Sequence, residues 1–214
     1  MKQKMNEFSI ALGLFDYINP IFYSITSITL IINMLELMKT RLFLLMLIGC
    51  IISIIFGLSI PTVKLLVGLG KMKFKMPVNL VAYVNSGILI TGISLFSYVY
   101  AIEPVVIVGM LVFILITLSL IYVKTKKTNT IAVLIGMFGY LLVYISLITI
   151  ALRNGYVLSV VLYAVAICLF LFLVVVGCKA NLKDAKVHWL IEISNAICQG
   201  LVAISTVLLF THIV

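Results

Sequence analysis

Four side chains that could bind a solute or exchange a proton lie on the last hydrophobic stretch of the chain. They are His188, Glu192, Asn195 and Gln199, within residues 187–210. In a helix that turns about 100° per residue, these four positions fall within an arc of roughly 60°. An ionisable group on an apolar membrane helix is costly, and it usually faces protein or water. The pattern therefore predicts one polar face directed into a protein interior.

Further polar residues lie near the start of the chain and in its middle. Asp16, Asn19, Tyr23 and Ser27 share a face of about 80° if this segment is helical. Elsewhere, Asn85 lies in the first half of an apolar stretch and Lys64 comes after another. Carboxylates, amides and a lysine on several helices could together bind a small polar or charged molecule.

The elements that position these residues must be membrane helices. Of the 214 residues, 64% are hydrophobic and only 10% are charged, and the mean hydropathy is +1.35. Soluble domains are roughly 45–50% apolar, so this chain lacks the polar surface that a water-soluble fold needs. We expect one all-α polytopic membrane domain covering residues 1–214.

Seven transmembrane helices are predicted. Each apolar stretch is close to the about 20 residues that a bilayer requires. Asn19-Pro20 is typical of a helix start, since Asn is a good N-cap and Pro a good first residue. It therefore predicts a short interfacial helix over 7–18 before the first span. The predicted spans are 18–38, 42–60, 78–100, 104–123, 130–152, 156–178 and 187–210.

The basic residues predict an orientation for these spans. With seven spans, twelve of the 15 Lys and Arg residues fall on the side of the N-terminus and three on the other side. The positive-inside rule then places the N-terminus in the cytoplasm and the C-terminus outside. The net charge of +9 is explained by this asymmetry, and we expect no nucleic-acid partner. We expect the cell membrane, in a bacterium, as the location.

This orientation predicts a polar cavity that opens to the cytoplasm. Its walls would be the spans 18–38, 42–60, 78–100 and 187–210, whereas the other three, mainly aliphatic and aromatic, would form a lipid-facing scaffold. Glu192 needs a cation partner if it is ionised there, and Lys64 and His188 lie at similar depth. The candidate ligand-binding residues are Glu192, Asn195, Gln199, His188, Asn85, Asp16, Asn19, Tyr23 and Lys64.

The longest predicted loop, 61–77, alternates lysine with apolar residues near its end. Lys71, Lys73 and Lys75 are expected to contact anionic lipids of the inner leaflet. A lid over the cavity is the alternative for this segment.

No catalytic, metal or cofactor motif is found. Two histidines give neither a zinc-enzyme motif nor a spaced His cluster, and the four cysteines form no CxxC pair.

The first hypothesis is therefore a carrier or permease-like protein for a small polar or cationic solute. A membrane-embedded enzyme acting on a lipid or isoprenoid phosphate is one alternative, with Glu192 and His188 as its acid and base. A non-catalytic subunit, sensor or immunity protein that meets a partner membrane protein is the other. The polar row can also be read as helix packing.

Overall fold

A computed structural model describes residues 10–71, 78–125, 128–179 and 185–213 of the chain. Within these ranges every regular element is an α-helix, and no strand occurs. The predicted all-helical class is therefore confirmed. The helices are α1 (Ile10–Phe15), α2 (Ile18–Met34), α3 (Thr40–Gly68), α4 (Val78–Val99), α5 (Pro104–Thr125), α6 (Thr128–Arg153), α7 (Val157–Lys179) and α8 (Ala185–Ile213).

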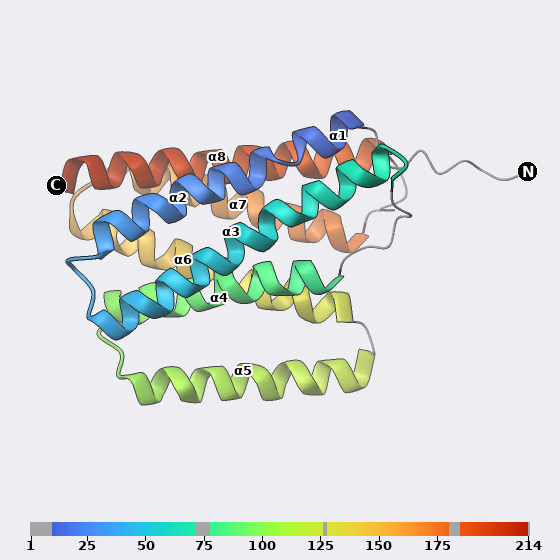
Figure 1. Ribbon diagram of the computed structural model, residues 1–214. Helices are drawn as coiled ribbons and strands as arrows, with labels where there is room; N and C mark the ends of the chain where they lie inside the picture. Colours follow the sequence, from blue (N-terminus) through green and yellow to red (C-terminus); the bar gives the residue numbers. More distant parts are fainter. Residues whose placement is uncertain (1–9, 72–77, 126–127, 180–184, 214) are drawn as a thin grey trace, which may run out of the picture.

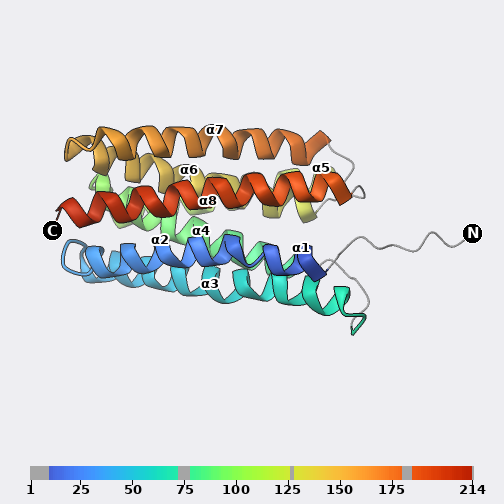
Figure 2. The ribbon, with the colours of Figure 1, turned by 90° about the horizontal axis from the view of Figure 1, so that it is seen from above.

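The long helices lie side by side along one axis and form a bundle (Figures 1 and 2). We call the end near Ile10 the N-terminal end of the bundle and the end near Ile213 its C-terminal end. α8 packs against both α2 and α7, whereas α4 packs against α3 and α6. α5 lies at the edge of the bundle, where it contacts α6 and α4 (Figure 1).

Six helical segments in the described ranges are long and apolar enough to cross a membrane. One of them is formed by α1 and α2 together, and the others lie in α3, α4, α6, α7 and α8. Large apolar side chains cover their outer surface, including Ile32 and Leu158, which are 66% and 63% exposed. Such a surface suits lipid and not water. The chain therefore has the architecture of a multi-pass membrane protein, while α5 as a seventh span stays a prediction.

The helix after the first loop is longer than predicted. α3 continues to Gly68, past Pro61, although the predicted span ended at residue 60. Proline lacks the N–H that would bond to the carbonyl of Gly57, but neighbouring helices in membrane proteins allow such a residue inside a span. The predicted loop over 61–77 is therefore wrong for residues 61–68. The consequence for the site is that Lys64 lies on a helix and not in a loop.

The break between α1 and α2 lies earlier than predicted. Tyr17, and not Asn19, precedes the first residue of α2, and it makes no side-chain cap. Pro20 explains the position, because its missing N–H would otherwise bond to the carbonyl of Asp16, four residues earlier. α1 covers Ile10–Phe15 and packs against α3, so the helix predicted over 7–18 is shorter and lies within the bundle; residues 7–9 are outside the described ranges.

Glycines bring three helices unusually close together. A Cβ on Gly49 of α3 would lie 2.7 Å from the carbonyl oxygen of Gly87 on α4. A Cβ on Gly139 of α6 would lie 2.6 Å from the backbone nitrogen of Leu89, also on α4. Small residues allow this approach in membrane helices. One side of α6 is therefore part of the bundle interior, and the prediction that this helix is only lipid-facing scaffold is wrong for that side.

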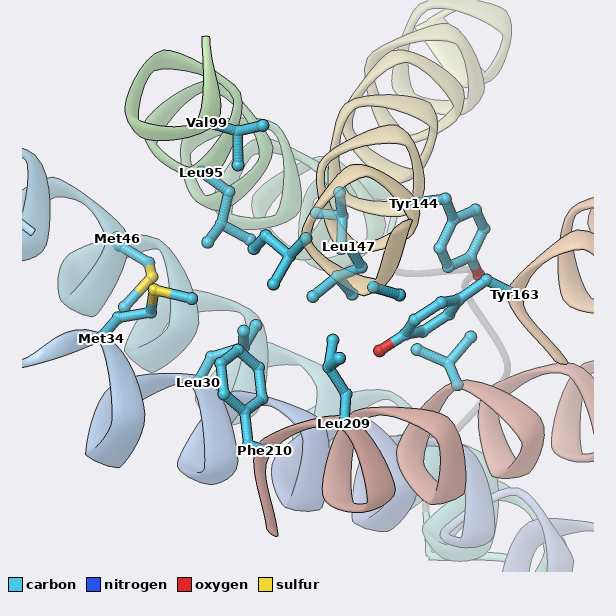
Figure 3. Packing of buried hydrophobic residues seen from close by; sticks show 14 of the residues in the cluster. Leu30, Met34, Met46, Leu95, Val99, Tyr144, Leu147, Tyr163, Leu209 and Phe210 are labelled. Atoms are coloured by element: carbon cyan, nitrogen blue, oxygen red, sulfur yellow. The ribbon is translucent and has the colours of Figure 1, made fainter. Parts of the chain in front are cut away.

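The apolar core lies towards the C-terminal end of the bundle. Leucines from α2, α4, α6 and α8 lie there and point toward one another (Figure 3). We call them the leucine plug, and each is at most 1% exposed. Its members are Leu30 of α2, Leu95 of α4, Leu147 of α6 and Leu209 of α8.

Candidate ligand-binding site

Towards the N-terminal end of the bundle, three ionisable side chains from different parts of the chain meet inside the protein. Lys64 of α3 places its Nζ 2.6 Å from Oδ2 of Asp16 and 2.9 Å from Oε1 of Glu192 on α8. Asp16 lies at the break between α1 and α2. The two acidic residues are 5% and 8% exposed. We call these three residues the ionic triad.

An asparagine connects the two carboxylates of the triad on their other side. Nδ2 of Asn19 donates to Oε2 of Glu192 at 3.0 Å and to Oδ1 of Asp16 at 3.4 Å. Asn19 occupies the first turn of α2, on the face that also carries Asp16 and Tyr23. Its side chain therefore serves the interior instead of capping the helix.

The charges of the triad do not balance. If all three groups are ionised, two carboxylates face one ammonium, which leaves a net charge of −1. Lys64 retains 16% side-chain exposure, so its end of the cluster is in contact with the outside. A buried charge is normally paired, because burying it alone is expensive. The cluster is therefore suited to one additional positive charge, from a cation or a proton.

Polar atoms without hydrogen-bond partners surround the triad. Oδ1 of Asn19 and the hydroxyl of Tyr23 are buried and make no hydrogen bond within the described structure. Oδ2 of Asp16 has Lys64 as an ion-pair partner but no aligned donor. Buried polar groups are normally satisfied, and those that are not need an explanation. A bound molecule or water with hydrogen-bond donors would provide one.

A cavity of about 210 Å³ adjoins these groups. α2, α3, α4 and α8 contribute to its wall, as does the segment between α1 and α2, and Tyr140 is contributed by α6. Seven of the nine candidate ligand-binding residues line it. These are Asp16, Asn19, Tyr23, Lys64, Glu192, Asn195 and Gln199.

The other two candidates are not brought into this group. The side chain of Asn85 lies against α6, where a Cβ on Gly136 would lie 2.6 Å from its amide oxygen, and it is not among the residues that line the cavity. Asn85 faces the contact between α4 and α6. Its side chain fits there because Gly136 of α6 has no side chain of its own. The side chain of His188 lies outside the described residues.

Of the three lysines predicted to contact lipid, the structure describes one. Lys71 is exposed, just after the end of α3. Lys73 and Lys75 lie outside the described residues.

Tyr140 was missed as a site residue. Its helix was predicted to belong to the scaffold, but its hydroxyl accepts a hydrogen bond from Nε2 of Gln199 at 3.2 Å and it lines the cavity. Ser53, Gly57 and Pro61 of α3 also line the cavity. The sequence held a signal for Tyr140, since it follows Gly136 and Gly139, and small residues on a membrane helix indicate close packing against a neighbour. Helix 130–152 should therefore have been placed in the interior.

The donor set of the cavity combines charged and neutral polar groups. Among the residues that the structure describes, no three His, Cys, Asp or Glu side chains come together to hold a metal. The cavity instead combines two carboxylates, amides and tyrosine hydroxyls. Such groups bind ammonium ions and other hydrogen-bond donors through charge and direction.

Comparisons with protein-family models, with curated proteins and with solved structures yield no match to this chain.

Proposed function

We propose that this protein is a carrier of the cell membrane that binds a small cationic or polar solute in the cavity beside the ionic triad. The observation that carries the proposal is a buried cluster of two carboxylates and one ammonium, next to polar atoms that lack partners. A purely structural cluster would be expected to neutralise its own charge and satisfy its own hydrogen bonds.

The proposed topology has seven spans, with the N-terminus in the cytoplasm and the C-terminus outside. α5 supports the seventh span, since it has 22 residues and connects the two ends of the bundle. The excess of Lys and Arg on the side of Lys71 supports the orientation. In this arrangement the cavity opens to the cytoplasm, and Lys71 lies at the level of anionic lipid headgroups.

A second recess favours a gated carrier over an open channel. It has a volume of about 620 Å³, lies at the C-terminal end of the bundle, and is lined by Met34, Tyr98, Ile150 and Phe210 among others. The first cavity ends at residues 23, 88, 140 and 199 of the same four helices. On each of these helices, the last residue that lines the first cavity lies ten or eleven residues before the residue that lines the second recess. This spacing is about 15 Å along a helix. The leucine plug lies in this interval and closes the connection between them.

The test is solute uptake into liposomes that contain the purified protein. The liposomes are incubated with a defined mixture of small amines, amino acids, polyols and sugars, and their contents are measured by mass spectrometry. We expect the wild type and the control Glu103→Gln, which alters an exposed carboxylate, to accumulate at least one cationic or polar solute. Glu192→Gln should not accumulate it. Equal contents in all three preparations, or in empty liposomes, would contradict a carrier function.

A further inference from the structure

The ammonium group of Lys64 lies where a cationic ligand would be expected to bind. It is within 2.9 Å of both carboxylates of the triad, so the protein has already built a site for an ammonium ion. The carboxylates come from the α1–α2 break and from α8, and the lysine comes from α3. The ammonium of Lys64 is thus attached to α3 through a flexible side chain, whereas the two carboxylates that bind it come from other parts of the bundle.

The lysine can leave this position without a change in the helices. Lys64 lies near the end of α3, four residues before Gly68, and its side chain is 16% exposed. Lysine carries its charge on a four-carbon chain that can extend towards water while the backbone stays in place. Asp16 and Glu192 are less exposed, at 7% and 11% of their side chains, and cannot follow it.

We propose that Lys64 acts as a tethered substitute for the substrate, and that the ligand is a small primary ammonium compound whose ammonium group replaces that of Lys64 between Asp16 and Glu192. This inference rests on the proposed function and names its substrate class. An N–H donor is required because ionised carboxylates only accept hydrogen bonds, and Oδ1 of Asn19 beside them has no donor. A quaternary ammonium ion would supply the charge but no donor.

The ammonium group of Lys64 would stabilise the carrier when no substrate is bound. Two buried carboxylates without a cation would be unstable, because an uncompensated buried charge is costly. With Lys64 in place the empty state stays folded, and each substrate must compete with the lysine. If Lys64 occupies the site nine-tenths of the time, the apparent affinity for substrate falls about tenfold. Removal of the lysine should recover that factor.

The experiment is chemical rescue of Lys64→Ala. This substitution removes three methylene groups and the ammonium, and propylammonium replaces nearly the same atoms. Thermal unfolding of the detergent-purified protein is followed against the concentration of propylammonium, with tetramethylammonium as the probe that lacks N–H donors. Lys71→Ala is the matched control, since it removes an exposed lysine close to the same helix end. We expect the concentration of propylammonium that gives a fixed rise in melting temperature to be about tenfold lower for Lys64→Ala than for wild type or Lys71→Ala.

Two results would overturn the inference. If all three proteins need the same concentration of propylammonium for the same rise in melting temperature, Lys64 does not occupy the ligand position. Equal stabilisation of Lys64→Ala by tetramethylammonium would mean that the site selects charge and not an ammonium donor. If Lys64→Ala does not fold, the double variant Lys64→Ala with Asp16→Asn is used, because it keeps the wild-type net charge of −1 without the lysine. The double variant is then compared with Asp16→Asn alone, which lacks the same carboxylate but keeps the lysine, and it should again respond to a lower concentration of propylammonium.

Failure of this inference can be separated from failure of the proposed function. Glu192-dependent uptake of a solute, without rescue by propylammonium, would leave the carrier intact and remove Lys64 from the role of substitute. Absence of both would contradict the two proposals together.

Discussion

Replacing the lysine of the ionic triad should lower the free energy of unfolding more than replacing the carboxylate of Glu192. Lys64→Met leaves Asp16 and Glu192 without a cation, and the charge of the cluster changes from −1 to −2. Breaking a buried ion pair in this way costs about 3–5 kcal/mol, and the 16% exposure of Lys64 favours the lower figure, about 3 kcal/mol. Glu192→Gln brings the charge to zero and keeps the 2.6 Å pair between Lys64 and Asp16.

The cost of Glu192→Gln should therefore be small. Glutamine has one side-chain oxygen, which can accept from Lys64 in the place of Oε1, while its amide nitrogen takes the place of Oε2. The amide of Asn19 can turn so that its Oδ1, which has no donor, accepts from that nitrogen. The expected loss is about 1 kcal/mol or less. The free energy of unfolding of wild type and both variants is measured by denaturant titration in the same detergent, without added solute. The two variants should differ by at least about 2 kcal/mol. Equal losses would refute the reasoning, because they would show that the triad has no excess negative charge to offer a ligand.

Three further predictions concern the frame around the site. Gly49→Ala should cost about 1–3 kcal/mol in denaturant titration, because its Cβ would meet the α4 backbone, whereas Gly109→Ala should not destabilise, since nothing lies within 4 Å of a Cβ there. Leu147→Ala should cost about 2–5 kcal/mol by leaving a void in the leucine plug, whereas Leu152→Ala on the exposed side of the same helix should cost little. A single cysteine at Glu103, in a cysteine-free background, should react with a membrane-impermeant maleimide from outside intact cells; labelling only after lysis would contradict the proposed orientation.

The positions of the long helices could be predicted well because bilayer thickness constrains them. α4, α6, α7 and α8 begin and end within three residues of the predicted spans. The two prolines were less predictable. Pro20 disrupts the helix at Asp16, one turn before itself, and Pro61 does not end α3 at all. A proline removes one hydrogen bond in both cases, and the neighbouring helices, which the sequence does not show, decide whether the helix breaks or continues.

Site residues could be predicted where they form a polar face on one helix. They could not be predicted where the packing of helices against one another determines which side chains meet. Glu192 and Gln199 were found because a polar row on an apolar helix must face inward. The contact of Lys64 with Asp16 depends on the continuation of α3 beyond Pro61, which the sequence did not reveal. Asn85 looked equally suitable, but it lies against Gly136 because two helices approach closely there. Helix-to-helix distances, and not residue types, separate these outcomes.

The central claim is that the buried cluster of Asp16, Lys64 and Glu192 binds a solute. It is tested most directly by a screen of small cationic and polar metabolites against the purified protein, read by thermal unfolding of wild type and Glu192→Gln side by side. A ligand that binds the native state raises the melting temperature by mass action. We expect at least one cationic or polar compound to stabilise the wild type and to leave Glu192→Gln unchanged. If no compound stabilises the wild type and Glu192→Gln melts well below it, the cluster only holds helices together and the claim is wrong.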